Sequence, residues 1–92
     1  MLMTSEGLRL MPVYVDDAFI PYGRMKMCHM IANTEEELHT MADMVGVKRK
    51  WFQSGSKPHY DVCKSKRNEA IRQGAIPVTA KEIVSLLAKE PE

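Results

Sequence analysis

The sequence has few cysteines, no long apolar run and neither of the two familiar nucleotide-binding loops. Its 92 residues include two cysteines, too few for a disulfide scaffold, which indicates a reducing compartment. No apolar run approaches the roughly 18 residues of a membrane span, and the first residues lack a signal-peptide pattern. Neither G-x-x-x-x-G-K-S/T nor G-x-G-x-x-G occurs. We therefore expect a cytoplasmic protein without a membrane partner.

Composition and charge indicate one small globular domain with an uneven charge distribution. Hydrophobic residues make up 45% of the chain and charged residues 27%. We expect residues 1–10 to be a loose N-terminal extension and residues 11–92 to form a single α/β domain. The net charge is +1, but residues 48–72 contain eight Lys/Arg against two Asp/Glu. This excess favours an anionic partner; the alternative is a solvated basic face balanced by acidic neighbours in the fold.

Local patterns predict three helices and four strands. The clearest helix is capped by Asn33 or Thr34 and ended by Gly46. Its apolar positions follow the helical period: Leu38, Met41, Ala42 and Val45. A last helix begins after a Thr79–Glu82 capping box. Its expected buried positions are Ala80, Ile83, Val84 and Leu87. Strands are expected at 13–15, 25–32, about 48–53 and 75–78, and a middle helix at 60–73.

The order of these elements, β-β-α-β-α-β-α, predicts the α/β class, as a small layered domain with a short, largely parallel sheet. Ligands of such sheets gather beyond the carboxyl ends of the strands. Asp16 and Asp17 follow the first expected strand, and the 54–61 loop follows the third. We therefore expect these acids and His59 at the same edge of the sheet.

Carboxylates at the ends of strands are candidate metal ligands. Asp16 and Asp61 could hold Mg²⁺ or Mn²⁺ through oxygen. The alternative is an Asx-turn or a helix cap, which we favour for Asp17. Zinc is not expected, because Cys28-His29 and His59-x-x-x-Cys63 lack the usual zinc-site spacing.

Two histidines are candidate catalytic groups together with Asp61. His59, expected beside the N-terminus of the 60–73 helix, could act as a general base or, when protonated, contact a phosphate. His29 lies in an apolar strand, so its buried ring needs a partner such as Asp16, or it joins His59. The alternatives are an exposed loop histidine for His59 and a satisfied core histidine for His29. We assign no role to His39.

Cations and aromatic residues are candidate ligand-binding groups. Lys64 and Arg67 fall on one face of the expected 60–73 helix and, with Arg24, could clamp an anion. Tyr60 is a further ligand-binding candidate. Trp51, which directly follows three cations, could stack on a base, although the alternative is a core position. Lys66 is expected to be solvated.

Several short motifs resemble a family of small bacterial and phage proteins known as a domain of unknown function. The resemblance covers roughly residues 12–80. It is carried by Val13–Asp17, Tyr22–Met25, Met27–Met30, Glu37–His39, Met41–Ala42, Trp51–Gln53, Pro58–Asp61, Ser65–Arg67 and Gly74–Ala75. It implies a self-contained small domain, often phage-borne, and it brings no established activity, so no catalytic residue is carried over.

Three functions remain open at this point. The first is binding of a phosphorylated ligand or nucleotide in a His/Asp/Lys/Arg pocket, extended by metal-assisted phosphoester hydrolysis. The second is binding of nucleic acid by the 48–72 segment with Trp51. The third is a non-enzymatic phage accessory protein that binds and modulates a host defence protein. A homo-oligomer is compatible with all three.

Overall fold

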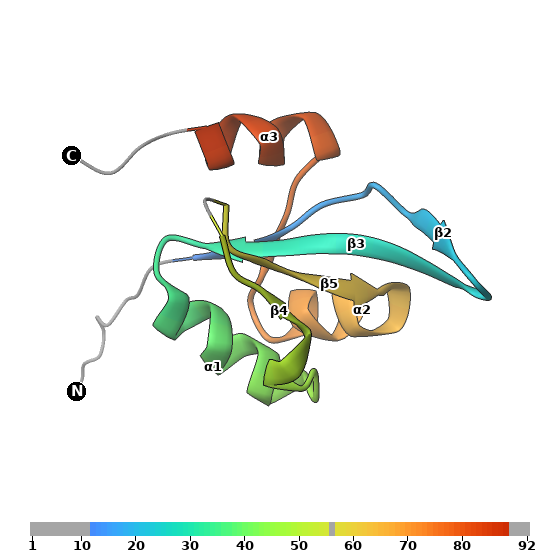
Figure 1. Cartoon of the computed structure of the whole chain (residues 1–92), viewed down its shortest axis with the longest axis horizontal. Coiled ribbons are helices and arrows are strands. Elements are labelled where there is room, and N and C mark those ends of the chain that lie inside the picture. Colours follow the sequence, from blue (N-terminus) through green and yellow to red (C-terminus); the bar gives the residue numbers. More distant parts are fainter. Residues whose placement is uncertain (1–11, 56, 89–92) are drawn as a thin grey trace.

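The computed structural model describes residues 12–55 and 57–88, so the expected 1–10 extension lies outside the described residues. The chain forms a mixed sheet with helices on both faces (Figure 1). The elements are β1 (Val13–Val15), β2 (Ile20–Tyr22), β3 (Met25–Ala32), α1 (Glu35–Val45), the 3-10 helix η2 (Arg49–Trp51), β4 (Phe52–Gln53), β5 (His59–Cys63), α2 (Lys64–Arg72), β6 (Ile76–Pro77) and α3 (Ala80–Ala88). None of the helices in the described part is long and apolar enough to cross a membrane.

The sheet has the strand order β4-β5-β3-β1-β6, and β2 pairs with the outer half of β3. Every pairing is antiparallel except that of β1 with β6. The prediction of the α/β class is therefore confirmed, and the prediction of a largely parallel sheet is wrong. The crossovers β3–α1–β4 and β5–α2–β6 do join strands of the same direction, as expected of helical connections. However, the strands of each pair are not neighbours: the oppositely directed β5 separates β3 from β4, and β3 and β1 separate β5 from β6.

The predicted order of elements also fails at three places. The run Pro21-Tyr22-Gly23 is typical of a turn, but residues 20–22 form the short strand β2. The expected strand at 48–53 is mostly η2, and only its last two residues form β4. The expected 60–73 helix begins at Lys64, because the preceding residues form β5. In β5 the buried side chains of Tyr60 and Val62 alternate with half-buried neighbours, which is the period of a strand.

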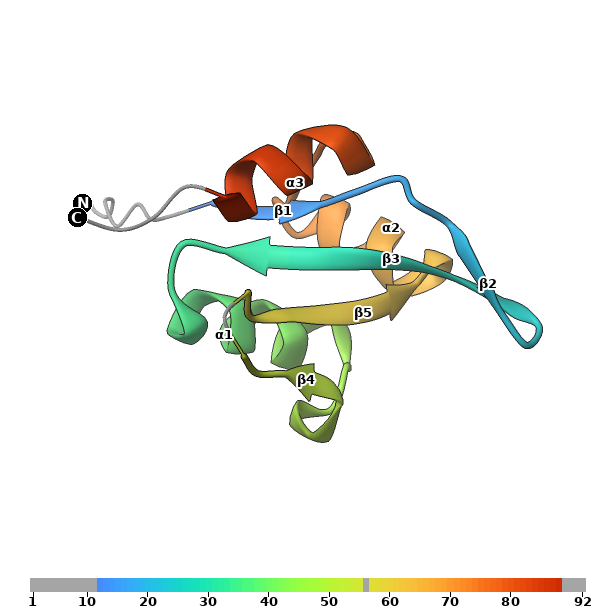
Figure 2. The same ribbon diagram turned by 45° about the horizontal axis from the view of Figure 1, so that its top comes forward.

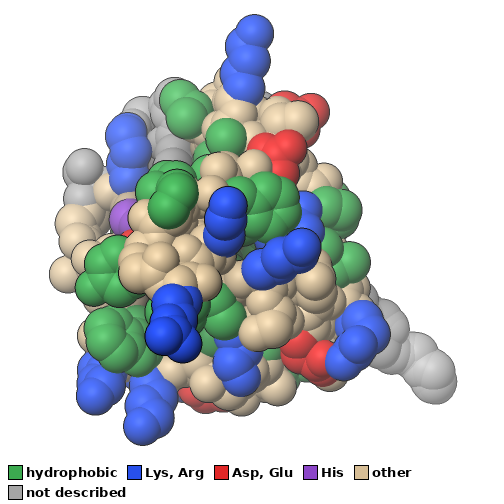
Figure 3. Space-filling model, turned by 90° about the vertical axis from the view of Figure 1, so that its right-hand side faces the viewer, with side chains coloured by type: hydrophobic (Ala, Val, Ile, Leu, Met, Phe, Trp, Pro, Cys, Tyr) green, Lys and Arg blue, Asp and Glu red, His purple; other side chains and the backbone are tan. Residues whose placement is uncertain are grey.

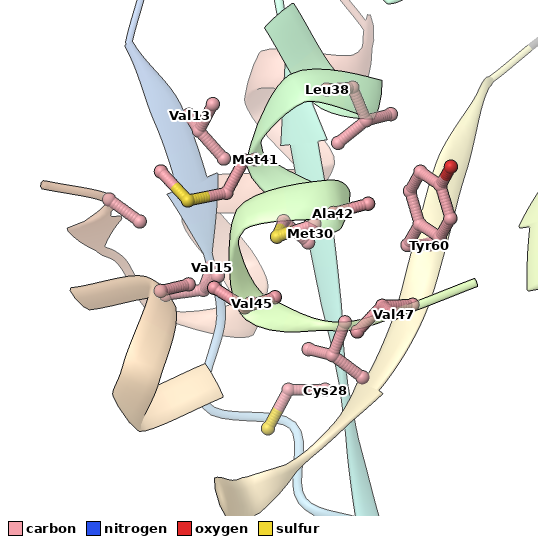
Figure 4. Packing of buried hydrophobic residues seen from close by; sticks show 13 residues of the cluster. Val13, Val15, Cys28, Met30, Leu38, Met41, Ala42, Val45, Val47 and Tyr60 are labelled. Atoms are coloured by element: carbon pink, nitrogen blue, oxygen red, sulfur yellow. The ribbon is translucent and has the colours of Figure 1, made fainter. Parts of the chain in front are cut away.

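The main core lies between the sheet and the helices α1 and α2. Its largest buried side chains come from β1, β3, β5 and α1 (Figure 4). The predicted stripe of α1 is buried, Thr34 Oγ1 accepts a hydrogen bond from the Glu37 amide, and Gly46 ends the helix with φ of 82°. At α3 both hydrogen bonds of the capping box are present: the Thr79 amide donates to the Glu82 carboxylate, and the Glu82 amide donates to the Thr79 hydroxyl. Ile83 is buried as expected, whereas Val84 is 64% exposed and the Leu87 side chain lies outside the described residues.

Tyr60 is fully buried in this core and shares a hydrogen bond with a histidine. Its hydroxyl lies 2.7 Å from Nδ1 of His39, and both rings pack against Phe52. Burial raises the pKa of the Tyr60 hydroxyl above its usual value, so it stays neutral. The partner of this buried polar group is therefore His39, which the sequence had left without a role.

Tyr60→Phe is expected to destabilise the fold by about 1 kcal/mol, because it removes one buried hydrogen bond and leaves the His39 nitrogen unpaired. The urea midpoint should fall while the slope of the unfolding free energy against urea stays constant. Tyr22→Phe is the matched control, since Tyr22 is 69% exposed. Equal midpoints for the two variants would contradict this role for Tyr60.

Candidate metal centre

The pairing of β3 with β5 brings three of the predicted site residues together. His29 is the direct cross-strand partner of Asp61, and His59 lies two residues before Asp61 on the same face of β5. Asp16 follows β1, and its backbone amide donates to the carbonyl of His29. These residues therefore meet side by side across three strands. The expectation that they meet at the carboxyl ends of parallel strands is wrong, although the convergence itself is present.

Asp16 is a buried carboxylate whose two oxygens are both engaged. Its Oδ2 lies 2.7 Å from Nδ1 of His29. Its Oδ1 accepts the backbone amides of His29 at 2.8 Å and of Ala18 at 3.2 Å. The side chain has no exposed surface. Asp16 therefore orients His29, and its role as a metal ligand stays a prediction, since both of its oxygens already accept hydrogen bonds.

The loop after β1 is held in place by contacts that fix Asp16. Nε of Arg67 donates to the carbonyl of Asp16 at 2.6 Å, and the guanidinium lies 5.1 Å from the ring centre of Phe19. Phe19 itself adopts a left-handed conformation with φ of 47°, which is uncommon for a residue other than glycine. Arg67 thus acts as a structural clamp on this loop, and its contacts do not join it to Lys64 in the predicted anion clamp.

The hydrogen bonds of the two histidines determine which ring nitrogen is free. Nδ1 of His29 faces the Asp16 carboxylate, and Nδ1 of His59 lies 3.0 Å from the carbonyl of Lys57. Both partners can only accept, so each Nδ1 carries a proton. In the neutral ring the lone pair then lies on Nε2. This is the orientation that metal-binding histidines adopt when outer partners hold their other nitrogen.

Three ligand atoms meet on this face of the sheet, and we call His29, His59 and Asp61 the triad. His59 Nε2 lies 3.3 Å from Asp61 Oδ1, and His29 Nε2 lies 3.9 Å from the same oxygen. The three residues offer ligand atoms that all lie within 4.8 Å of one another. Atoms bound to one tetrahedral ion at about 2.1 Å are about 3.4 Å apart, so small movements would place all three on one ion.

The triad faces outward on a part of the sheet that none of the described helices covers. Helices α1 and α2 lie behind β3 and β5, and α3 lies over the β1 side of the other face (Figure 2). Exposed fractions of the side chains are 32% for His29, 26% for His59 and 43% for Asp61. Water or a substrate can therefore reach an ion held by the triad.

Asp17, beside Asp16, accepts a hydrogen bond from the Ala80 amide at 2.8 Å. It therefore caps α3, which agrees with the alternative that we favoured for it.

The thiols lie outside the triad. Cys28 is buried on the core face of β3, where burial raises the pKa of its thiol. Cys63 ends β5 as the N-cap residue of α2. Burial would raise the pKa of its thiol, but hydrogen bonds from the Ser65 hydroxyl and the backbone amides of Ser65 and Lys66 outweigh it and lower the pKa. The spacing of these cysteines counts against a zinc site only if they are ligands, and not against a ligand set of two imidazoles and a carboxylate.

Other predicted ligand-binding residues contribute no ligand atom to the triad. Tyr60 faces the core on the opposite side of β5. Trp51 is 55% exposed on η2, with Nζ of Lys50 5.4 Å from its ring centre, so the core alternative is wrong and stacking on a base stays a prediction. Arg24 is exposed at the turn between β2 and β3, and Lys64 is exposed at the start of α2.

The basic 48–72 segment does not form one continuous basic face. Arg49 pairs with Asp43 at 3.0 Å, and Arg72 pairs with Glu69. The ammonium of Lys66 lies beside the C-terminal end of α1, where it is half-buried, so its expected solvation is only partial. Near it, an open groove of about 690 Å³ between α1 and α2 is lined by residues of both charge signs. Many of the eight cations are therefore already engaged within the fold.

The comparisons with known proteins identify a family without an assigned activity. The family model described as "Protein of unknown function (DUF4031)" matches residues 13–90. The chain belongs to this family, as the motif resemblance over residues 12–80 had indicated. Neither the comparison with curated proteins nor the comparison with solved structures found a match. The function must therefore be argued from the triad and its surroundings.

Proposed function

We propose that the protein binds a divalent transition-metal ion through the triad and uses it to hydrolyse a phosphoester. The supporting observation is that Nε2 of His29 and Nε2 of His59 lie 3.9 and 3.3 Å from Asp61 Oδ1, with both Nδ1 atoms engaged by acceptors. Two imidazoles and a carboxylate suit Zn²⁺, Mn²⁺ or Fe²⁺ better than Mg²⁺, which prefers oxygen ligands alone. A cytoplasmic location is part of the same proposal.

Three protein ligands leave coordination positions open, as in catalytic rather than structural sites. An ion held there would supply Lewis acidity and lower the pKa of a bound water. Asp16 would keep the His29 ring in the binding tautomer, and the Lys57 carbonyl would do the same for His59. The partial exposure of the triad would let a substrate reach the ion directly.

The choice of an anionic substrate is supported by the charges beside the triad. Exposed lysines flank β5 at both ends, Lys57 before His59 and Lys64 after Cys63. Neither lysine forms an ion pair within the described ranges. Cations on both sides of a metal centre favour a substrate with negative charge, such as a phosphate ester.

We expect metal-free protein to be inactive on bis(p-nitrophenyl) phosphate and to gain activity when Mn²⁺ or Zn²⁺ is added. Asp61→Asn should remove both metal binding, followed by calorimetry, and turnover, followed by release of p-nitrophenol. The matched control is Asp43→Asn, since Asp43 is an exposed carboxylate on α1 outside the triad. Absence of metal binding by the wild-type protein would sink the proposal, and binding without turnover would remove its hydrolytic part.

A further inference from the structure

A hairpin arm, made of β2 and the outer half of β3, projects from the body of the protein (Figures 1 and 2). Three of its apolar side chains are strongly exposed, Ile20 at 49%, Tyr22 at 69% and Met25 at 46%. Tyr22 pairs with Met25, and Ile20 pairs with Met27. These four residues share one face of the arm, and the alternation along β3 makes it the face that carries His29. An exposed apolar stripe therefore leads along β3 to the triad.

The charge of the arm is entirely positive. Residues 20–27 contain Arg24 and Lys26 and no carboxylate. Lys64, one residue beyond the end of β5, continues this charge beside the arm, because Cys63 pairs with Met27. Figure 3, which views the end of the molecule that carries the arm, shows Lys and Arg side chains with hydrophobic groups between them. Apolar and aromatic surface between cations complements a strand of bases and phosphates.

The arm is poorly suited to pairing with a strand of another protein. Among the described residues β2 pairs only with β3, so its outer edge is open. However, β2 has three residues, and the middle one is Pro21, which has no amide to donate. Short edge strands with proline resist the addition of another strand. The exposed side chains of the arm, rather than its backbone edge, are therefore its binding surface.

We propose that the arm binds single-stranded nucleic acid and directs one of its phosphodiesters to the triad. This inference rests on the proposed metal-dependent function and names its substrate class. Tyr22 stacks on a base and Arg24, at the turn, contacts a phosphate, while Lys26, on the opposite face of the arm, adds to its positive charge. Met25 and His29 are four residues apart on β3, about 13 Å at the rise of a strand, so a single strand bound along the arm reaches the triad within a few nucleotides.

The reaction is hydrolysis of one ester bond by one water molecule. The water oxygen bonds to phosphorus, the ester P–O bond breaks, and the leaving oxygen takes a proton from that water. The products are one end with a phosphate monoester and one end with a hydroxyl.

The test compares two triple variants of the full chain that remove the same kinds of groups. The arm variant is Tyr22→Ser, Arg24→Gln and Lys26→Gln. The matched control changes η2 and the residue before it: Trp51→Ser, Lys48→Gln and Lys50→Gln. All six side chains are exposed, so both variants should fold, which circular dichroism checks. Binding of a fluorescent single-stranded oligonucleotide is measured by anisotropy at several salt concentrations, and its cleavage by gel electrophoresis with Mn²⁺.

We expect the arm variant to lose about tenfold or more in oligonucleotide affinity and to show a weaker salt dependence, while the control changes by less than about twofold. Both variants should keep wild-type metal affinity and wild-type turnover of bis(p-nitrophenyl) phosphate. If the control loses affinity instead, or if wild-type protein shows no salt-dependent binding while it hydrolyses the small ester, the arm proposal is overturned and the metal-dependent function stands. A dimer that only the arm variant dissociates, seen by analytical ultracentrifugation without oligonucleotide binding, also overturns it.

Discussion

His59→Gln should lower the affinity for Zn²⁺ or Mn²⁺ at least about a hundredfold, and His29→Gln should do the same. Each change removes one of three protein ligands. The loss of metal affinity should therefore exceed the 10–100-fold loss that follows removal of a residue that only hydrogen-bonds to a ligand. The ligand atoms already lie 3.3 and 3.9 Å from Asp61 Oδ1, so little reorganisation opposes binding in the wild-type protein. Calorimetric titration of metal-free protein measures the affinities directly.

The control for these variants is His39→Gln. His39 also has its Nδ1 in a hydrogen bond, to Tyr60, but its ring packs against core aromatic residues instead of the triad. This variant should lose some stability and keep its metal affinity. If His39→Gln weakens metal binding as much as His59→Gln, the ion is held by a different set of residues and the triad is not the site.

Asp16→Asn should have the second large effect, on metal affinity and on stability together. The Asp16 carboxylate accepts from two backbone amides and from Nδ1 of His29. An Asn side chain would place its NH₂ group against one of these donors. Either that donor then stays unpaired, or His29 changes its tautomer. In the changed tautomer, Nε2 of His29 carries the proton and no longer binds an ion. We expect a 10–100-fold loss of metal affinity and a loss of about 1–3 kcal/mol in the free energy of unfolding.

Asp17→Asn is the control for this variant, because Asn can still accept the hydrogen bond from the Ala80 amide that Asp17 accepts. Metal affinity is measured by titration and stability by urea unfolding at neutral pH. Asp16→Asn protein that unfolds more easily but binds metal as tightly as the wild type would show that Asp16 supports the fold alone. The proposed orientation of His29 would then be wrong.

The helices were predictable from the sequence because their signals are local. Thr34 and Gly46 lie at the two ends of α1, and the Thr79–Glu82 box begins α3, all within one or two turns of the residues that they cap. The strand β5 was missed because its five residues run directly into α2 without a turn residue between them. Over so short a run the strand and helix periods are hard to separate.

The members of the candidate site were predictable, but their arrangement was not. A histidine in an apolar strand needs a partner, which pointed to Asp16 for His29, and the structure contains this pair. The position of Asp61 opposite His29 depends on the antiparallel register of β3 and β5, which are joined through α1 and β4. That register follows from packing of the whole core.

The basic 48–72 segment is a second case in which the sequence identifies residues but does not predict how they are arranged in space. Positive charge that is contiguous in sequence is divided in the fold, because α2 turns Arg67 toward Asp16 and Arg72 toward Glu69. Conversely, Pro21-Tyr22-Gly23 is typical of a turn, although these residues belong to an arm whose second strand, β3, carries both Lys26 and His29. Clustering of cations in the sequence therefore overestimates the basic surface formed by residues 48–72 and underestimates the one formed by residues 20–27.

The most direct test is a crystal of the protein grown with Zn²⁺ or Mn²⁺ and measured at the absorption edge of that metal. The account predicts one anomalous peak on the open face of β3 and β5, about 2.0–2.2 Å from His29 Nε2, His59 Nε2 and an oxygen of Asp61. The hydrogen bond between His29 and Asp16 should remain. Crystals saturated with metal that show no peak there, or a peak bound instead by Cys63 or by surface carboxylates, would contradict it.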